Sequence, residues 1–267
     1  MIDPAETVDG LAALLPWLTA GTLTTFLLVL VRTSAWVLTA PGLSARGVGG
    51  TGRLGLAAAM SLFLTPLVQD GAPAPGLAAF AAAALAQVAI GLALGFLTGL
   101  LFAAFEVAGT LADLSSGFSF ASIVDPLSGQ PAAAFSRLFA MAFVAVLFAS
   151  DAYQTILRGF VHSFTALPLD ALPTLSAGTA TALGHAVTAI LAAALQVGAP
   201  LLGVLFLTDV ALSMASRFVP QANALAMAMP VKTLVALSAA GATLALLPGH
   251  AAALLEPAVR LPFEVLR

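Results

Sequence analysis

The residues of this chain that could do chemistry are charged side chains inside apolar segments. Glu106 and Asp113 lie seven positions apart, on one face of a predicted helix and about 10 Å apart along its axis. Two carboxylates so placed could form a proton relay. They could also each pair with a cation on another helix or subunit, and this interpretation is favoured because no transporter-like cluster of polar residues accompanies them.

Charged side chains recur in the other apolar segments as well. A charge in hydrocarbon costs several kcal/mol, so these side chains should face protein or water and have partners there. We predict that a set of such charges holds the protein in an assembly. The set is Arg32, Glu106, Asp113, Arg137, Asp209, Arg217 and Lys232.

Nothing in the sequence predicts an enzyme, a metal site or a cofactor. The three histidines, His162, His185 and His250, are scattered, and there is no cysteine and no nucleophile motif. The glycines at 47, 49 and 52 match a dinucleotide-binding pattern, but no strand precedes them. A net charge of −3 without a basic run argues against nucleic acid as a partner.

The elements that carry these residues are predicted to be membrane helices. The chain is 61% hydrophobic and 8% charged, and its apolar runs lack the alternation of barrel strands. We therefore predict an all-α polytopic membrane protein. Its apolar segments lie near residues 11–39, 54–69, 77–112, 132–165, 176–216 and 222–247, followed by a short amphipathic tail.

Two of these segments are too long for one bilayer. Residues 77–112 and 176–216 would extend about 54 and 61 Å as single helices, against a hydrocarbon core of about 30 Å. Prolines lie within or beside the last two segments, at Pro200, Pro220 and Pro230. We expect long, proline-broken helices and helical hairpins that pack inside protein.

Small residues predict one close helix contact. Gly91, Gly95 and Gly99 repeat every four residues and therefore share a helical face, on which another backbone could approach closely. We interpret this face as a packing stripe.

The stretch from Ser115 to Pro131, SSGFSFASIVDPLSGQP, is too polar for lipid and too aromatic for an ordinary linker. Gly117 and Gly129 loosen the backbone, and Pro126 stops a helix. Phe118, Phe120 and Ile123 supply bulky apolar groups. Such a loop could close the lumen of a conduit for large cargo and move aside without unfolding a helix. The alternative is a connection tucked between helices.

Several blocks of the sequence resemble the FliR/SctT family, a subunit of the type III secretion export gate of flagella and injectisomes. The blocks are RTSAWVLTAPGLSARGV (32–48), GLALGF (91–96), GFSFASIVDPLSG (117–129), SFTALPL (163–169) and RFVPQANALAMAMPVK (217–232). The last block is the most specific. Its motif residues are Pro220, Gln221, Asn223 and Pro230, together with Lys232.

The resemblance implies a multi-pass protein of the bacterial inner membrane and the flagellar basal body. It implies one copy in a ring with FliP-like and FliQ-like subunits, near a FlhB-like switch subunit. Residues 11–175 would be FliP-like and residues 176–267 a FliQ-like hairpin and tail. The plug would lie in loop 113–131, and unfolded proteins would pass when it opens. Its residues would be Gly117, Phe118, Ser119, Phe120, Ile123, Asp125 and Pro126.

Other functions stay open at this point. The sequence favours a flagellar subunit over an injectisome one, although Ser150 to Gln154 (SDAYQ) departs from the Asn-Gly-His of many flagellar members. A proton-coupled transporter of small solutes would use Glu106, Asp113 or Asp209 as carriers. An enzyme acting on lipid would need a cluster of metal ligands or a nucleophile.

Overall fold

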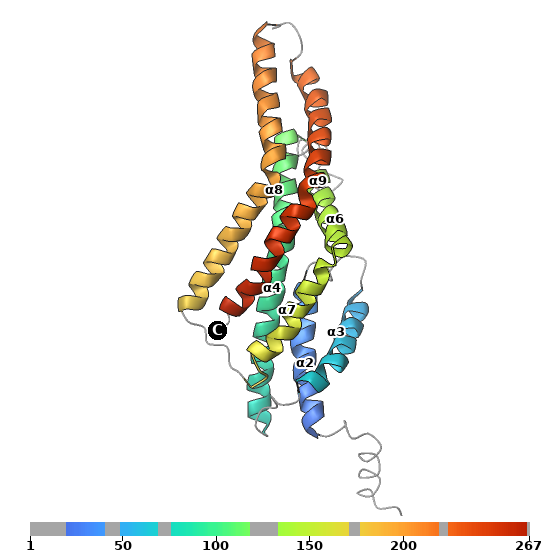
Figure 1. The fold of residues 1–267 in the computed structure, drawn as a ribbon, viewed down its shortest axis with the longest axis vertical. Coiled ribbons are helices and arrows are strands. Elements are labelled where there is room, and N and C mark those ends of the chain that lie inside the picture. The colour runs from blue at the N-terminus through green and yellow to red at the C-terminus, as the bar shows by residue number, and fades with distance from the viewer. Residues whose placement is uncertain are drawn as a thin grey trace, which may run out of the picture. The chain divides into compact units, whose positions relative to one another are not determined.

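The computed structural model of the chain describes residues 20–40, 49–68, 76–117, 133–170, 177–218 and 224–265. The regular secondary structure in these ranges is helical throughout (Figure 1). The helices are α2 (Ala20–Thr39), α3 (Gly50–Leu64), the 3₁₀ helix η1 (Thr65–Leu67), α4 (Leu77–Ser116), α6 (Ala134–Ala149), α7 (Ala152–Ala166), α8 (Ala177–Phe218) and α9 (Ala224–Val265).

Four described stretches are long and apolar enough to cross a membrane. They are Gly21–Thr39, Leu77–Ser116, Val187–Arg217 and Ala228–Gly249. The pair α6 and α7, bent by 80° at its break, makes a fifth if it is counted as one span. α3 has 15 residues, fewer than the roughly 20 that a spanning helix needs. The prediction of an all-α polytopic membrane protein is confirmed.

The long helices continue through their prolines. α8 is one helix of 42 residues with Pro200 inside it, although the sequence predicted a break there. α9 likewise contains Pro230 and Pro248 and continues to Val265, where a separate tail was expected. A proline removes one backbone hydrogen bond and crowds the preceding turn, but the other bonds of a 42-residue helix remain. Pro200 is exposed, so the helix has room to adjust around its ring.

A tight corner joins α6 to α7. The Ser150 amide donates to the Val146 carbonyl at 2.9 Å, which completes the last turn of α6. Asp151 then has φ 53°, in the left-handed region, which among non-glycine residues aspartate and asparagine occupy most readily. This residue turns the chain into α7.

The described residues fall into two compact units. The first comprises α2, α3, η1, α4 up to Gly99, α7 from Leu157 onward, α8 up to Ala182 and the end of α9 from Arg260. The second comprises α4 from Leu100, α6, the start of α7, α8 from Leu183 and α9 up to Val259. The second unit thus combines residues from both sides of position 175, the predicted boundary between a FliP-like and a FliQ-like part. That boundary stays a prediction.

Aromatic side chains fill the core of the second unit. Phe105 of α4 stacks on Phe143 of α6 with ring centroids 4.0 Å apart, and Phe102 meets the same ring edge-on at 5.0 Å. Buried Leu201 and Leu205 bring α8 into this core. In Figure 1, α8 and α9 form a hairpin, and Ala236 and Ala240 of α9 complete the core.

The first unit packs α2 against α4 and α7. Trp36 of α2 is buried and stacks on Phe160 of α7, with centroids 4.4 Å apart. The Trp36 indole also donates to the Thr98 hydroxyl of α4 at 3.4 Å. An aromatic residue therefore links all three helices.

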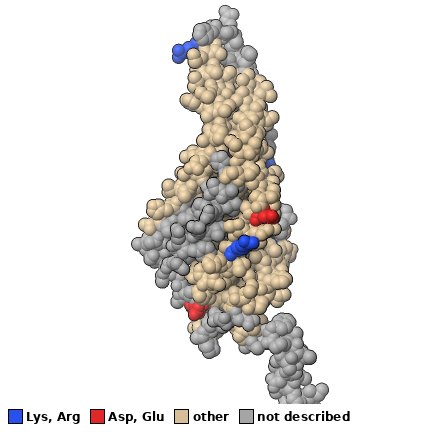
Figure 2. All heavy atoms as spheres, in the orientation of Figure 1, with Lys and Arg blue, Asp and Glu red and all other residues tan. Residues whose placement is uncertain are grey.

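Much of the apolar surface stays uncovered within the chain. Phe63, Leu77 and Met141 are each more than 70% exposed. The face drawn in Figure 2 carries few charged side chains among its described residues. Such a surface suits contact with lipid or with other membrane subunits.

Candidate functional site

The described end of α4 leads into the stretch that the sequence predicts to be a plug. α4 ends at Ser116, and Gly117 follows with φ 85°, the left-handed conformation with which a glycine often terminates a helix. The remaining predicted plug residues lie outside the described residues: Phe118, Ser119, Phe120, Ile123, Asp125 and Pro126. The candidate site is therefore its two flanks, the end of α4 and the start of α6.

The carboxylate of Asp113 joins the two flanks. Its Oδ1 accepts a hydrogen bond from the Phe135 amide and its Oδ2 one from the Ser136 amide, both at 3.0 Å. Asp113 is only 4% exposed. The sequence predicted a cation on another helix or subunit as its partner, whereas here two backbone amides at the start of α6 satisfy both oxygens.

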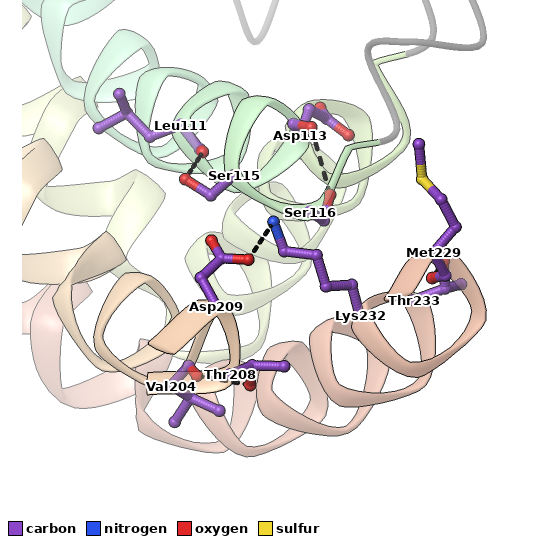
Figure 3. Close-up of polar contacts among 10 residues, drawn as sticks. All are labelled: Leu111, Asp113, Ser115, Ser116, Val204, Thr208, Asp209, Met229, Lys232 and Thr233. Carbon is purple, nitrogen blue, oxygen red and sulfur yellow. Dashed lines mark hydrogen bonds and ion pairs between the residues drawn. The ribbon is translucent and has the colours of Figure 1, made fainter. Parts of the chain in front are cut away.

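A second polar contact lies between α8 and α9. The Lys232 ammonium is 2.7 Å from Asp209 Oδ1, and Figure 3 shows Lys232 extending from α9 to the carboxylate on α8. The side chain of Lys232 is 19% exposed and that of Asp209 is 50% exposed. Two of the predicted assembly charges therefore pair with each other inside the chain.

Arg32 occupies a buried polar site in the first unit. Its guanidinium donates to Gln87 Oε1 of α4 at 2.5 Å, to the Ser163 carbonyl at 3.0 Å and to the Leu167 carbonyl at 2.8 Å. The ring of Phe164 lies 4.4 Å from the guanidinium carbon, within the range of a cation–π contact. Arg32 is fully buried, and these three acceptors of its guanidinium are uncharged.

The other predicted assembly charges are exposed within the chain. Glu106 lies on α4, Arg137 on α6 and Arg217 in the last turn of α8. Pro230 of the C-terminal motif is also exposed, on α9. The rest of that motif, Pro220, Gln221 and Asn223, lies outside the described residues.

The small-residue face of α4 lies against α2. A Cβ added at Gly91 would be 2.5 Å from the Arg32 carbonyl, and one added at Gly95 would overlap the Thr39 hydroxyl. Both glycines are buried, while Gly99 is half-buried. The absence of side chains at Gly91 and Gly95 lets the two backbones approach closely.

Sequence reasoning missed the partners of the buried charges. Gln87 is fully buried and bridges Arg32 to Leu169, since its side-chain oxygen accepts from Arg32 and its side-chain amide donates to the Leu169 carbonyl at 3.1 Å. Gly109 and Ser136 form the contact beside Asp113. Gly109 lies outside the four-residue spacing of Gly91, Gly95 and Gly99, so the small-residue pattern did not indicate it. Gln87 could have been identified from one signal, a single glutamine within an apolar helix.

No group of three or more potential metal ligands occurs among the described residues. In the second unit, hydrogen bonds join α4 to α6, and the ion pair of Asp209 with Lys232 joins α8 to α9.

Known proteins resemble this chain over most of its length. Residues 23–258 match the family described as bacterial export proteins, family 1. The flagellar biosynthetic protein FliR of Escherichia coli (strain K12) is 30% identical over 222 residues, 82% of this chain and 83% of that protein. FliR of Bacillus subtilis (strain 168) is 29% identical over 213 residues, 79% and 82% of the two chains.

A secretion protein matches equally well. The Yop proteins translocation protein T of Yersinia pestis is 29% identical over 218 residues, 80% of this chain and 83% of that protein. The family match covers far more than half of the sequence and confirms the resemblance found in its motifs. The chain is a member of the bacterial export protein family that contains FliR and its SctT counterparts.

Proposed function

We propose that the chain is a non-enzymatic, structural subunit of a type III protein export gate in the bacterial inner membrane. The observation that carries this proposal is the family match over residues 23–258, together with relatives named for flagellar biosynthesis and Yop translocation. The helices long enough to span a membrane are consistent with that location.

The loop between α4 and α6 would be the plug of the gate. Its sequence supplies Phe118, Phe120 and Ile123, bulky side chains able to fill a lumen. The hydrogen bonds that Asp113 accepts from the Phe135 and Ser136 amides support this role, because they join the two flanks of the loop. A loop with fixed ends can move aside while its supporting helices stay in position.

The gate would be completed by other subunits. We propose one copy of this chain in a ring with FliP-like and FliQ-like proteins, next to a FlhB-like switch subunit. The degree of burial supports this assembly, since only 33% of the most apolar window of α8 and 22% of that of α9 are buried within the chain. Unfolded flagellar proteins would be the cargo.

An injectisome subunit is the second candidate. Protein T of Yersinia pestis is as similar to this chain as the flagellar relatives are. We favour the flagellum because the sequence of the loop between α4 and α6 and the residues Ala45-Arg46-Gly47-Val48 resemble flagellar members of the family more closely. Deletion of the gene distinguishes the flagellar from the injectisome assignment. Loss of a flagellar subunit should abolish motility and the secretion of flagellar hook protein, whereas loss of an injectisome subunit would leave motility and hook-protein secretion unchanged.

A proton-coupled transporter finds little support among the described residues. Of its candidate carriers, Asp113 is bound to two amides and Asp209 is paired with Lys232. Glu106 is exposed on α4. A transporter would move its solute as a lone purified chain in liposomes, whereas a gate subunit would be inert without its partners.

Trimming the plug tests the proposed function most directly. Replacing Phe118, Ser119 and Phe120 by glycine should make the resting membrane leak ions and leave assembly of the complex intact, because the side chains that fill the lumen would be gone. Conductance of the complex in planar bilayers measures the leak. A conductance equal to that of the unmodified complex would contradict the plug.

A further inference from the structure

The first turn of α6 is capped from another helix. The first backbone amides of a helix have no partner within it and need acceptors from elsewhere. Ala133, at the N-cap position of α6, makes no capping bond through its side chain. Asp113 of α4 supplies both acceptors instead, and its negative charge suits the positive end of the α6 dipole.

A very close backbone contact surrounds this cap. A Cβ added at Gly109 would lie 2.5 Å from Ser136 Cα and 2.6 Å from the Phe135 carbonyl. The Ser136 hydroxyl donates to the Glu106 carbonyl at 3.2 Å, and the Thr110 hydroxyl donates to Ser136 Oγ at 3.3 Å.

These contacts come from one face of α4. Positions 106, 109, 110 and 113 follow the spacing of a single helical face. That face holds the start of α6 through backbone and hydroxyl groups as well as through the carboxylate.

We infer that Asp113 is a positioning residue that keeps the end of α4 and the start of α6 at a fixed separation. The inference rests on the proposed function for its biological meaning, because the segment between these two ends is the proposed plug. Asp113 then acts within one subunit and is not one of the charges that hold the assembly together. It acts on the frame of the plug, by which we mean the end of α4 and the start of α6.

The contact requires a carboxylate. An aspartate offers one acceptor oxygen to each amide, whereas an asparagine offers one oxygen and turns an NH₂ group toward an N–H. A glutamate is one methylene longer and has no room, because Gly109 already brings the two backbones to their closest distance. Replacing Asp113 by asparagine should therefore loosen the frame with almost no change in volume.

Spin labels can report the separation directly, because the chain contains no cysteine. Leu114 on α4 is 59% exposed and Leu138 on α6 is 38% exposed, so cysteines at these two positions accept labels without disturbing the core. Pulsed electron resonance on the labelled full chain in its complex gives the distribution of distances between them. The otherwise unmodified chain should give one narrow peak, and Asp113→Asn and Asp113→Ala should broaden or shift it.

The matched control is Asp151→Asn, which removes a carboxylate from an exposed corner at the other end of α6. It should leave the distance distribution unchanged. If the Asp113→Ala variant does not accumulate, the Asp113→Asn variant alone decides the test, since asparagine has the same shape as aspartate. Distributions for both Asp113 variants that superimpose on the original would overturn the inference.

Conductance of the same complexes separates this inference from the proposed function. A broadened distribution with an ion leak supports both. A broadened distribution without a leak keeps Asp113 as the residue that positions the frame and argues against the plug. An unchanged distribution refutes the positioning role, whatever the conductance.

Discussion

Arg32 is fully buried in the first unit, and it connects three parts of that unit through acceptors on Gln87, Ser163 and Leu167. A planar guanidinium has five N–H donors in a fixed fork, so it can reach acceptors in several directions at once. The three N–H donors of a lysine radiate from one nitrogen, so they do not reproduce this fork.

Replacing Arg32 by alanine should strongly destabilise the first unit. Each buried acceptor left without a donor costs about 1–3 kcal/mol. Gln87 Oε1 and the Leu167 carbonyl lose the guanidinium, while the Ser163 carbonyl keeps its bond from the Leu167 amide. The free energy of unfolding of the purified chain in detergent measures the loss. Arg158→Ala is the matched control: Arg158 is exposed on α7, and its removal should change stability by no more than about 0.5 kcal/mol. Equal losses for the two variants would refute the role of Arg32.

The pair of Asp209 and Lys232 makes a reversible prediction. Lys232→Glu should lower the yield of assembled complex, because two carboxylates would then face each other and repel. Adding Asp209→Lys to the same chain should restore the yield, because the pair is re-formed with opposite signs. Affinity purification followed by quantification of co-purified subunits measures both. If the double variant is as poor as the single one, Lys232 acts through another partner.

At the scale of the helices, the contact of α2 with α4 depends on two glycines of α4, Gly91 and Gly95, where there is no room for a side chain. Alanine at Gly91 would place its Cβ 2.5 Å from a backbone carbonyl and 2.7 Å from Ala35 Cβ. Neither neighbour can move without shifting a helix.

Gly91→Ala should therefore lower the free energy of unfolding by about 1–3 kcal/mol. The control Gly55→Ala places a Cβ where nothing lies within 4 Å, on exposed α3, and should raise helix stability by up to about 1 kcal/mol. Thermal unfolding of the two purified variants, followed by circular dichroism, compares them. A Gly91→Ala variant as stable as the original would mean that α2 and α4 are not this close.

Helix positions were largely predictable from the sequence, while their ends and contacts were not. Long apolar runs predicted α4, α8 and α9 because a backbone in hydrocarbon must satisfy its own hydrogen bonds. The breaks expected at Pro200 and Pro230 did not appear, since the tolerance of one missing hydrogen bond depends on the space around the proline ring.

The contacts of the buried charges were likewise not predictable from the sequence. The sequence indicated that Arg32 and Asp113 need partners, but apart from Gln87 Oε1 the hydrogen-bond partners named above are backbone carbonyls and backbone amides. Every residue except proline carries the same backbone groups, so no residue type marks which of them will lie close. Only the fold brings position 113 to positions 135 and 136.

For the whole molecule, uncovered apolar surface is the property that matters most. Large apolar side chains such as Phe206, Leu234 and Leu237 are at least 60% exposed on α8 and α9. Native mass measurement of the complex purified through this chain should therefore find other hydrophobic subunits, with one copy of this chain for several of them. A particle made of this chain alone would contradict the proposed ring.

Arg217 offers a test of assembly that leaves the fold intact. It is exposed in the last turn of α8, where its positive charge also suits the end of the helix dipole. Arg217→Glu should reduce co-purification of the partner subunits while the chain itself still accumulates in the membrane. Normal recovery of the complex would remove Arg217 from the set of assembly charges.

At the proposed location in the inner membrane, the two sides of the protein differ in acidity, and the partners of Arg32 have a consequence there. Amide and peptide oxygens neither gain nor lose a proton in the range that cells experience. The protonmotive force therefore cannot disconnect Gln87, Ser163 or Leu167 from the guanidinium, as it could an acidic counter-ion. This fastening should hold equally well in energised and de-energised cells.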